Sequence, residues 1–280
     1  MMTCSRRYLL HAAVAAVLFF AERPEAYAAS ATHASHRAFY EISIGRVDQG
    51  SSILDARGRM VTEWRRACEG WTTSQRLVVS MAPGEGEPID SEVTLTSFEN
   101  ADGTEYVFDS ETRIGGETVE LVRGRAAREA PGKVGKVTYE EPAGLSLDLP
   151  ADTVFPFEHT LVLLDAAERG DRRAFNHYFD GSQPEISPLA SNALILGKPR
   201  DGADGQFAQF GELTARKWWP IRLAMFNGRV SHGGEEQPEF EMTQNLQDNG
   251  IVRSFEFDYG DFSLVASMVE LEELDAPRCD

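Results

Sequence analysis

Hydrophobic side chains recur at every second position in much of this sequence, and short glycine-containing segments interrupt the pattern. Val93 and Leu95 alternate with polar residues, and Tyr106 and Phe108 resume the alternation after Asp102-Gly103. A period of two residues sends alternate side chains to opposite faces of a β-strand, so that one face is buried. The pattern therefore predicts a chain made mostly of strands.

The segments between these runs have the composition of tight turns. They are Asp102-Gly103, Gly115-Gly116, Asn227-Gly228, Asn249-Gly250 and Gly260-Asp261. Glycine and asparagine adopt the positive φ angles of two-residue hairpins, so each pair predicts a reversal of the chain. Repeated reversals at short spacing favour an antiparallel meander over parallel βαβ units.

One segment has helical spacing instead. Phe157, Leu161 and Leu164 lie on one face between Pro156 and Gly170. Proline suits the first turn of a helix and glycine suits the residue after its end, so we expect one main α-helix over about 156–169. Seven or eight strands are expected before it and about seven after it. A sheet of that width curls or closes, because twist accumulates and bare edges invite aggregation.

The first residues resemble an export signal. Arg6 and Arg7 precede a short apolar run from Leu9 to Phe20, and Ala26-Tyr27-Ala28 offers small residues for cleavage. The run is too short to span a bilayer, so we expect a cleaved signal peptide over residues 1–28 and no stable transmembrane anchor. An N-terminal anchor is the alternative, and the paired arginines leave the choice between the Sec and twin-arginine routes open.

Residues 29–280 would then form the mature protein, which we interpret as a single domain. The loop from Lys198 to Gly205 is the best alternative boundary. Cleavage would remove three arginines and two glutamates, which changes the net charge from −18 to −19. So acidic a surface repels phosphates, which argues against nucleic acid or an anionic membrane surface as the partner.

The mature chain would keep two cysteines, Cys68 and Cys279, because Cys4 is removed with the signal. Two cysteines in an oxidising compartment favour a disulfide, and two unpaired thiols are the alternative. No histidine or cysteine lies at ligand spacing beside either residue, so no metal site is expected.

No local motif for catalysis or for a cofactor occurs in the sequence. A glycine-rich phosphate loop, a CxxC pair and a glycine-flanked nucleophilic serine are all missing. We therefore expect no enzyme activity, no catalytic residues and no cofactor. The tryptophans Trp71, Trp218 and Trp219 are candidates for an apolar groove, although ordinary core positions also explain them.

Several longer stretches resemble a known family, the EipB family of alphaproteobacterial cell-envelope integrity proteins. They are His36 to Ile44, Ala67 to Trp71, Val154 to Thr160, Tyr178 to Ser182, Pro238 to Glu241, Asn249-Gly250, and Asp258 to Phe262 with the chain on to Cys279. The resemblance covers nearly the whole mature chain, and the cysteine pair with the C-terminal run is its most specific part.

The resemblance implies a periplasmic, open barrel-like β-spiral of about fourteen strands, with a disulfide at the positions of Cys68 and Cys279. It also implies a role in envelope integrity without established enzyme activity, and a fold similar to the lipoprotein carriers LolA and LolB. We expect a non-catalytic periplasmic protein that binds an envelope protein or other envelope component. The alternative is a carrier of lipid or acylated protein; an enzyme that acts on envelope polymers is a third reading.

Overall fold

The computed structural model describes residues 33–202, 205–228 and 237–279. The chain divides into two units, Met1–Ser30 and Ala31–Asp280, and every described residue belongs to the second. The signal peptide expected over residues 1–28 lies outside the described residues.

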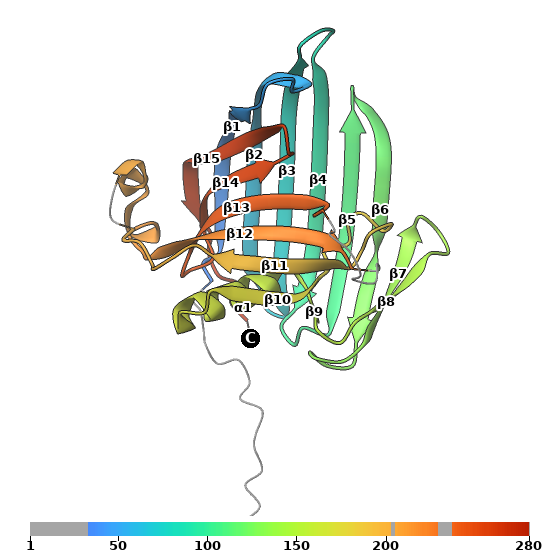
Figure 1. Ribbon diagram of the computed structural model, residues 1–280. Coiled ribbons are helices and arrows are strands. Elements are labelled where there is room, and N and C mark those ends of the chain that lie inside the picture. The colour runs from blue at the N-terminus through green and yellow to red at the C-terminus, as the bar shows by residue number, and fades with distance from the viewer. Residues whose placement is uncertain (1–32, 203–204, 229–236, 280) are drawn as a thin grey trace, which may run out of the picture. The chain divides into compact units, whose positions relative to one another are not determined.

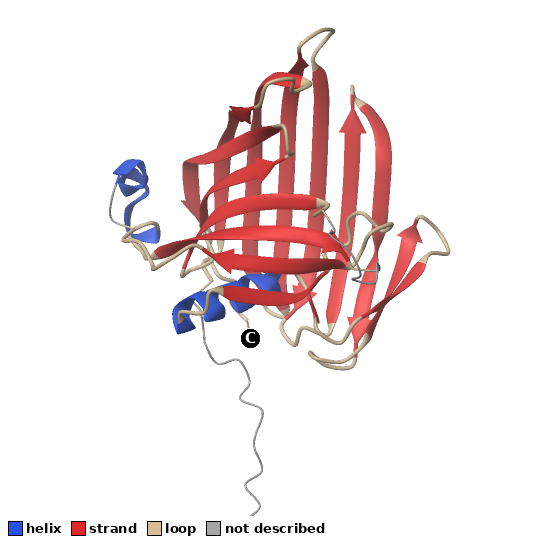
Figure 2. Cartoon of the chain, in the orientation of Figure 1, coloured by secondary structure: helices blue, strands red, loops and turns tan. Residues whose placement is uncertain are grey.

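Strands make up most of the described chain (Figure 2). The strands before the helix are β1 (His36–Val47), β2 (Ile53–Ala67), β3 (Gly70–Pro83), β4 (Ile89–Asn100), β5 (Glu105–Ile114), β6 (Glu117–Arg128), β7 (Gly135–Glu141), β8 (Ser146–Leu149) and β9 (Thr153–Val154). The helix α1 (Pro156–Arg169) follows. The remaining elements are β10 (Arg173–Tyr178), β11 (Leu189–Ile195), the 3-10 helix η1 (Gly205–Leu213), β12 (Trp218–Asn227), β13 (Phe240–Gln247), β14 (Val252–Asp258) and β15 (Phe262–Glu273).

The strands of the described part form a 15-stranded sheet with the order β8-β7-β6-β5-β4-β3-β2-β1-β15-β14-β13-β12-β11-β10-β9. Its two edge strands, β8 and β9, are consecutive in the chain and only Pro150 to Asp152 separate them. The sheet therefore curls until it is nearly closed. Strands β10 to β13 cross in front of the long strands β1 to β4 (Figure 1). The prediction of a mostly antiparallel, barrel-like sheet is confirmed, with fifteen strands where about fourteen were expected.

Most of the predicted turns are present. Gly103, Gly115, Gly250 and Gly260 have φ angles of 62°, 60°, 81° and 90°. The chain also reverses after Asn227, since β12 and β13 pair antiparallel, but the expected tight turn at Asn227-Gly228 was wrong, because β13 begins only at Phe240.

Gly228 serves a different purpose from a tight reversal. A Cβ atom at this position would lie 2.1 Å from the carbonyl oxygen of Pro188, so only glycine lets the two backbones approach. A dipeptide pattern does not distinguish these two uses of glycine.

The helix α1 has the bounds that the sequence predicted. It begins at Pro156, and Gly170 follows its end in the left-handed region with φ 78°. Leu163 and Leu164 pack on the buried side chains of β11 to β13. The 3-10 helix η1 was not predicted, and its Phe207 packs against the core of β1, β2 and β15.

Candidate functional site

A cavity of about 320 Å³ lies inside the curled sheet. Its lining comes from β1 to β3 on one side, from β11 to β14 on the other, and from α1 and the segment from Tyr178 to Gln183 between them. These elements are distant in sequence and meet only because the sheet curls. A volume of this size lies at the lower end of the range for small-molecule sites.

Most of the cavity wall is apolar. Met60 on β2, Leu163 on α1, Leu223 on β12, and Phe255 and Phe257 on β14 all line it. The rings of Phe255 and Phe257 are stacked at 5.7 Å, and Tyr40 meets Phe255 edge-on at 5.4 Å. The register of the strands explains this wall, since inward-facing positions of neighbouring strands lie side by side.

Polar side chains are spread over the lining, and three of them, Asp180, Ser182 and Gln183, come from one short segment after β10. Asp180 Oδ1 accepts hydrogen bonds from the backbone N–H of Ser182 at 2.9 Å and from its hydroxyl at 2.7 Å. Gln183, the next residue, lines the cavity and is also exposed to solvent. The cavity therefore reaches the surface beside Asp180, Ser182 and Gln183, which we call the mouth segment.

Two histidines of the lining are uncharged at neutral pH. Burial lowers the pKa of His159 to about 4, and burial also lowers the pKa of His36 to about 4. His36 Nδ1 donates to the carbonyl oxygen of Ala34 at 2.8 Å, and His159 Nε2 shares a hydrogen bond of 3.1 Å with Ser191 Oγ. Ser191 is fully buried and does not line the cavity, so the pair gives a nucleophile no access to a substrate.

The helix α1 lines the cavity and is held in place by two buried ionisable residues. Glu99 on β4 accepts the backbone N–H groups of the first helical turn. Arg128 on β6 pairs with Glu158 at 2.5 Å, donates to the carbonyl oxygen of Gly103 at 2.6 Å, and lies 4.7 Å from the ring centre of Phe155. The wall of the cavity is therefore fixed by interactions from several strands.

The three tryptophans proposed for an apolar groove have different surroundings. Trp71 stacks on Phe157 with ring centroids 4.7 Å apart, Trp219 is buried in the core behind α1, and Trp218 lies beneath Arg200 at 4.9 Å. None of the three lines the cavity, although Trp64 does. Met60, Met242 and Phe257 line the cavity from three different strands. The alternation around each of them is visible in the sequence, but which inward-facing residues share the cavity follows only from the pairing of the strands.

The two cysteines of the described chain lie next to each other. The Cα atoms of Cys68 and Cys279 are 5.5 Å apart, a separation that a disulfide spans. Cys68 follows β2 and Cys279 follows β15, and both strands pair with β1. The pair is thus disulfide-capable and would close a loop of 211 residues.

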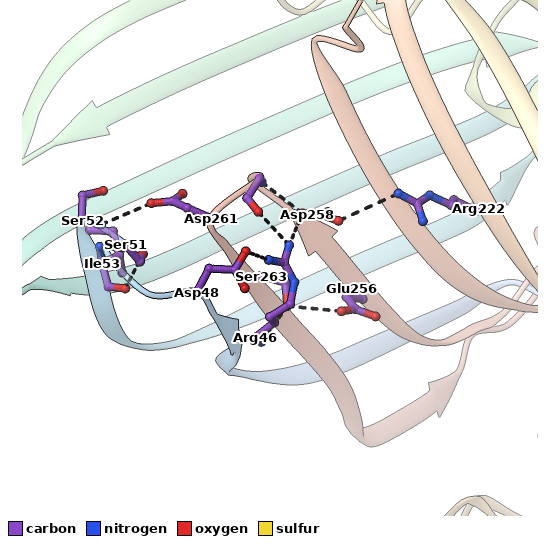
Figure 3. A network of polar contacts seen from close by, with 11 residues as sticks. Arg46, Asp48, Ser51, Ser52, Ile53, Arg222, Glu256, Asp258, Asp261 and Ser263 are labelled. Atoms are coloured by element: carbon purple, nitrogen blue, oxygen red, sulfur yellow. Dashed lines mark hydrogen bonds and ion pairs between the residues drawn. The ribbon is translucent and has the colours of Figure 1, made fainter.

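A second cluster of polar side chains lies on the outside of the sheet (Figure 3). Arg46 pairs with Asp258 at 2.8 Å, and its backbone N–H donates to Ser263 Oγ at 2.9 Å. Ser263 in turn donates to Glu256 at 3.2 Å, and Arg222 lies 4.0 Å from Asp258. Because these groups bind one another across β1, β12, β14 and β15, and the ion pair of Arg46 and Asp258 remains partly exposed, we interpret the cluster as a brace between strands.

Neither a cluster of potential metal ligands nor a helix that could cross a membrane is found in the described chain. Within residues 33–202, 205–228 and 237–279, no three His, Cys, Asp or Glu side chains come together as a potential metal site. None of the helices in this part of the chain has both the length and the apolar character needed to cross a bilayer.

Comparison with known proteins gives a consistent result. The family model described as EipB-like matches residues 27–275. The cell envelope integrity protein EipB of Brucella abortus (strain 2308) is 32% identical over 244 residues, which are 87% of this chain and 85% of the relative. The crystal structure of a beta-barrel-like protein of the domain of unknown function DUF1849, also from Brucella abortus, superposes with a TM-score of 0.77 and 31% identity. That alignment covers 86% of this chain and 98% of the other. Together with the nearly closed sheet and its sequence motifs, these matches show that the chain belongs to the EipB-like family.

Proposed function

We propose that this protein supports the integrity of the cell envelope as a non-catalytic periplasmic protein, and that it does so by binding an envelope protein or another envelope component. The observation that carries the proposal is the internal cavity, whose wall is assembled from strands on both sides of the curled sheet. Membership of the EipB-like family supports the envelope role, since a relative is named for envelope integrity. A preformed cavity limits the entropy lost on binding.

A disulfide between Cys68 and Cys279 is part of this proposal. It would join the end of β2 to the C-terminal tail beside the N-terminal strand. Disulfides persist in oxidising compartments such as the periplasm. The covalent bond would tie the strands on either side of β1 to each other, in the middle of the sheet that surrounds the cavity.

The alternative function is a carrier of lipid or acylated protein with a fold like that of LolA and LolB. The apolar wall with Phe255 and Phe257 favours it. Mass spectrometry can detect lipid that co-purifies with the protein from an envelope extract, and this result would distinguish a lipid carrier from a protein that binds other envelope components. Reproducible absence of co-purified lipid would count against the carrier.

The test of the main proposal fills the cavity. Met242 lines it from β13 and is only partly buried, so Met242→Trp adds volume where there is room. Cells that carry Met242→Trp in place of the native protein should lose resistance to detergent, whereas Val119→Trp, at an exposed position of β6, should not. Circular dichroism and the melting temperature establish that each variant folds, and Thr160→Trp on α1 is the second filling variant. Full resistance with a folded, filled cavity would overturn the proposal.

A further inference from the structure

We infer that the cavity takes an amphiphile with a hydrocarbon chain and a head group that carries no net negative charge. The inference rests on the proposed function and names the class of ligand for the same cavity. It follows from the charges of the lining and from the position of the mouth segment.

Asp180 is the sole carboxylate of the cavity lining described above, and this lining includes no lysine or arginine. The lining histidines, His36 and His159, are neutral because both are buried. An anionic head group would therefore meet a carboxylate without a counterion, in a chain whose net charge is −18.

The position of Asp180 indicates that it lies next to the head group of the ligand and not next to its hydrocarbon chain. Asp180 belongs to the mouth segment, where the cavity reaches solvent at Gln183. The apolar wall, with Leu223, Met242 and Phe257, lies on β12 to β14. An amphiphile satisfies both parts when its chain contacts the apolar wall and its head group lies at the mouth. A hydroxyl group finds hydrogen-bond acceptors there, and a cationic group is attracted by the charge of Asp180.

The backbone of the mouth segment is strained in a way that binding sites often are. Gln183 has a φ of 50°, and it is the one non-glycine residue of the described chain with a positive φ. Its carbonyl oxygen accepts the N–H groups of Ile186 and Ser187, both at 3.1 Å, which hold the turn in this conformation. Non-glycine residues in this region cluster at ligand clamps and switch regions.

The experiment compares three amphiphiles that share a dodecyl chain and differ in charge. Monolaurin is uncharged, dodecyltrimethylammonium is cationic and laurate is anionic. Each is titrated into the purified protein below its critical micelle concentration, at neutral pH and low salt, by calorimetry. We expect monolaurin and dodecyltrimethylammonium to bind, and laurate to bind at least about tenfold more weakly than monolaurin. Laurate binding as tightly as monolaurin, or no binding of any of the three, would overturn the inference. The proposed function has its own test, because the loss of detergent resistance in cells with Met242→Trp does not depend on which class of ligand the cavity takes.

Two variants locate the ligand. Asp180→Asn keeps a hydrogen-bond acceptor for Ser182 but removes the charge, so laurate should gain affinity and dodecyltrimethylammonium should lose about tenfold. Asp148→Asn, at an exposed position of β8, is the matched control and should leave all three affinities unchanged. Met242→Trp should abolish binding of all three. Binding that survives in a folded Met242→Trp variant, or an Asp180→Asn variant with unaltered charge preference, would show that the amphiphile lies elsewhere.

Discussion

The side-chain carboxyl group of Glu99 accepts a hydrogen bond from the backbone N–H of Phe157 at 2.8 Å, across 58 residues of sequence. Its other oxygen accepts the N–H of Glu158 at 3.1 Å. The N-cap residue itself, Phe155, provides no side-chain hydrogen bond. A strand therefore supplies the cap that the helix sequence lacks, and it satisfies N–H groups that would otherwise remain unpaired at the helix start.

We expect Glu99→Ala to lower the free energy of unfolding by about 2–4 kcal/mol, because two half-buried backbone N–H groups lose their partner. Chemical denaturation measures the change. Thr96→Ala, at an exposed position of the same strand, is the control and should stay within about 0.5 kcal/mol of the native protein. Equal effects of the two substitutions would show that the cap is not stabilising.

The stability of the protein should be greatest near pH 6.5. Burial lowers the pKa of His33 to about 3 and the pKa values of His36 and His159 to about 4, each from an ordinary 6.5. These residues must remain neutral in the folded state, so each loses roughly 1.4 kcal/mol of stabilisation per pH unit as the pH falls below 6.5. Burial raises the pKa of Glu99 from 4.5 to about 8, although its two N–H donors oppose the rise.

The sign for Glu99 is the reverse of that for the histidines. Its stabilising contribution is complete below pH 4.5 and is lost as the pH rises through 8, because the unfolded state then releases the proton first. Between pH 4.5 and 6.5 the three histidines outweigh the one carboxyl, and between 6.5 and 8 only Glu99 acts. Melting temperatures measured from pH 4 to 9 should therefore pass through a maximum, and Glu99→Gln should flatten the alkaline side. A curve that rises steadily to pH 9 would contradict this assignment.

Gly181 should not tolerate alanine. Its φ is 85°, and a Cβ atom there would lie 2.2 Å from the ring of Phe108, in the aromatic core of β5. Gly115, with φ 60°, has the same backbone requirement but no atom within 4 Å of an added Cβ. Both alanine variants have the strain of a positive φ, so the difference between them measures the steric conflict with Phe108. In denaturation experiments we expect Gly181→Ala to lower the free energy of unfolding by at least about 2 kcal/mol more than Gly115→Ala does. Similar losses for the two variants would show that Phe108 moves aside freely.

Removal of the cysteine pair should reduce the stability of the oxidised protein. Chain-entropy arguments give an upper bound of about 5 kcal/mol for a loop of 211 residues, and we expect Cys68→Ser to cost about 2–5 kcal/mol. Cys279→Ser and the double variant should have the same effect, because each removes the same bond. Reductant should lower the melting temperature of the native protein to that of the variants. A native melting temperature that is insensitive to reductant would contradict the disulfide.

Local patterns in the sequence were sufficient to predict most strands and the main helix of this protein. The alternation around Val93 and Leu95 predicted strands, and Pro156 with Gly170 predicted both ends of α1. These features depend on neighbours within a few residues, through φ preferences and the burial of one face. The same local reasoning misread Gly228, whose requirement comes from Pro188, and it did not predict η1, whose Phe207 is placed by contacts with the sheet.

The sequence by itself thus determined that the chain is a mostly β protein with one main helix, because side-chain periodicity and turn residues act locally. Only the tertiary structure decided where a ligand could bind. The cavity exists because the curl of the sheet brings β2 opposite β13 and β14, and the cap from Glu99 exists because β4 passes beside the start of α1. The composition of the sequence made Trp71, Trp218 and Trp219 reasonable candidates for a groove, but none of them lines the cavity. Strand register and sheet curvature decide which side chains face the cavity, and both are properties of the whole sheet and not of any one strand.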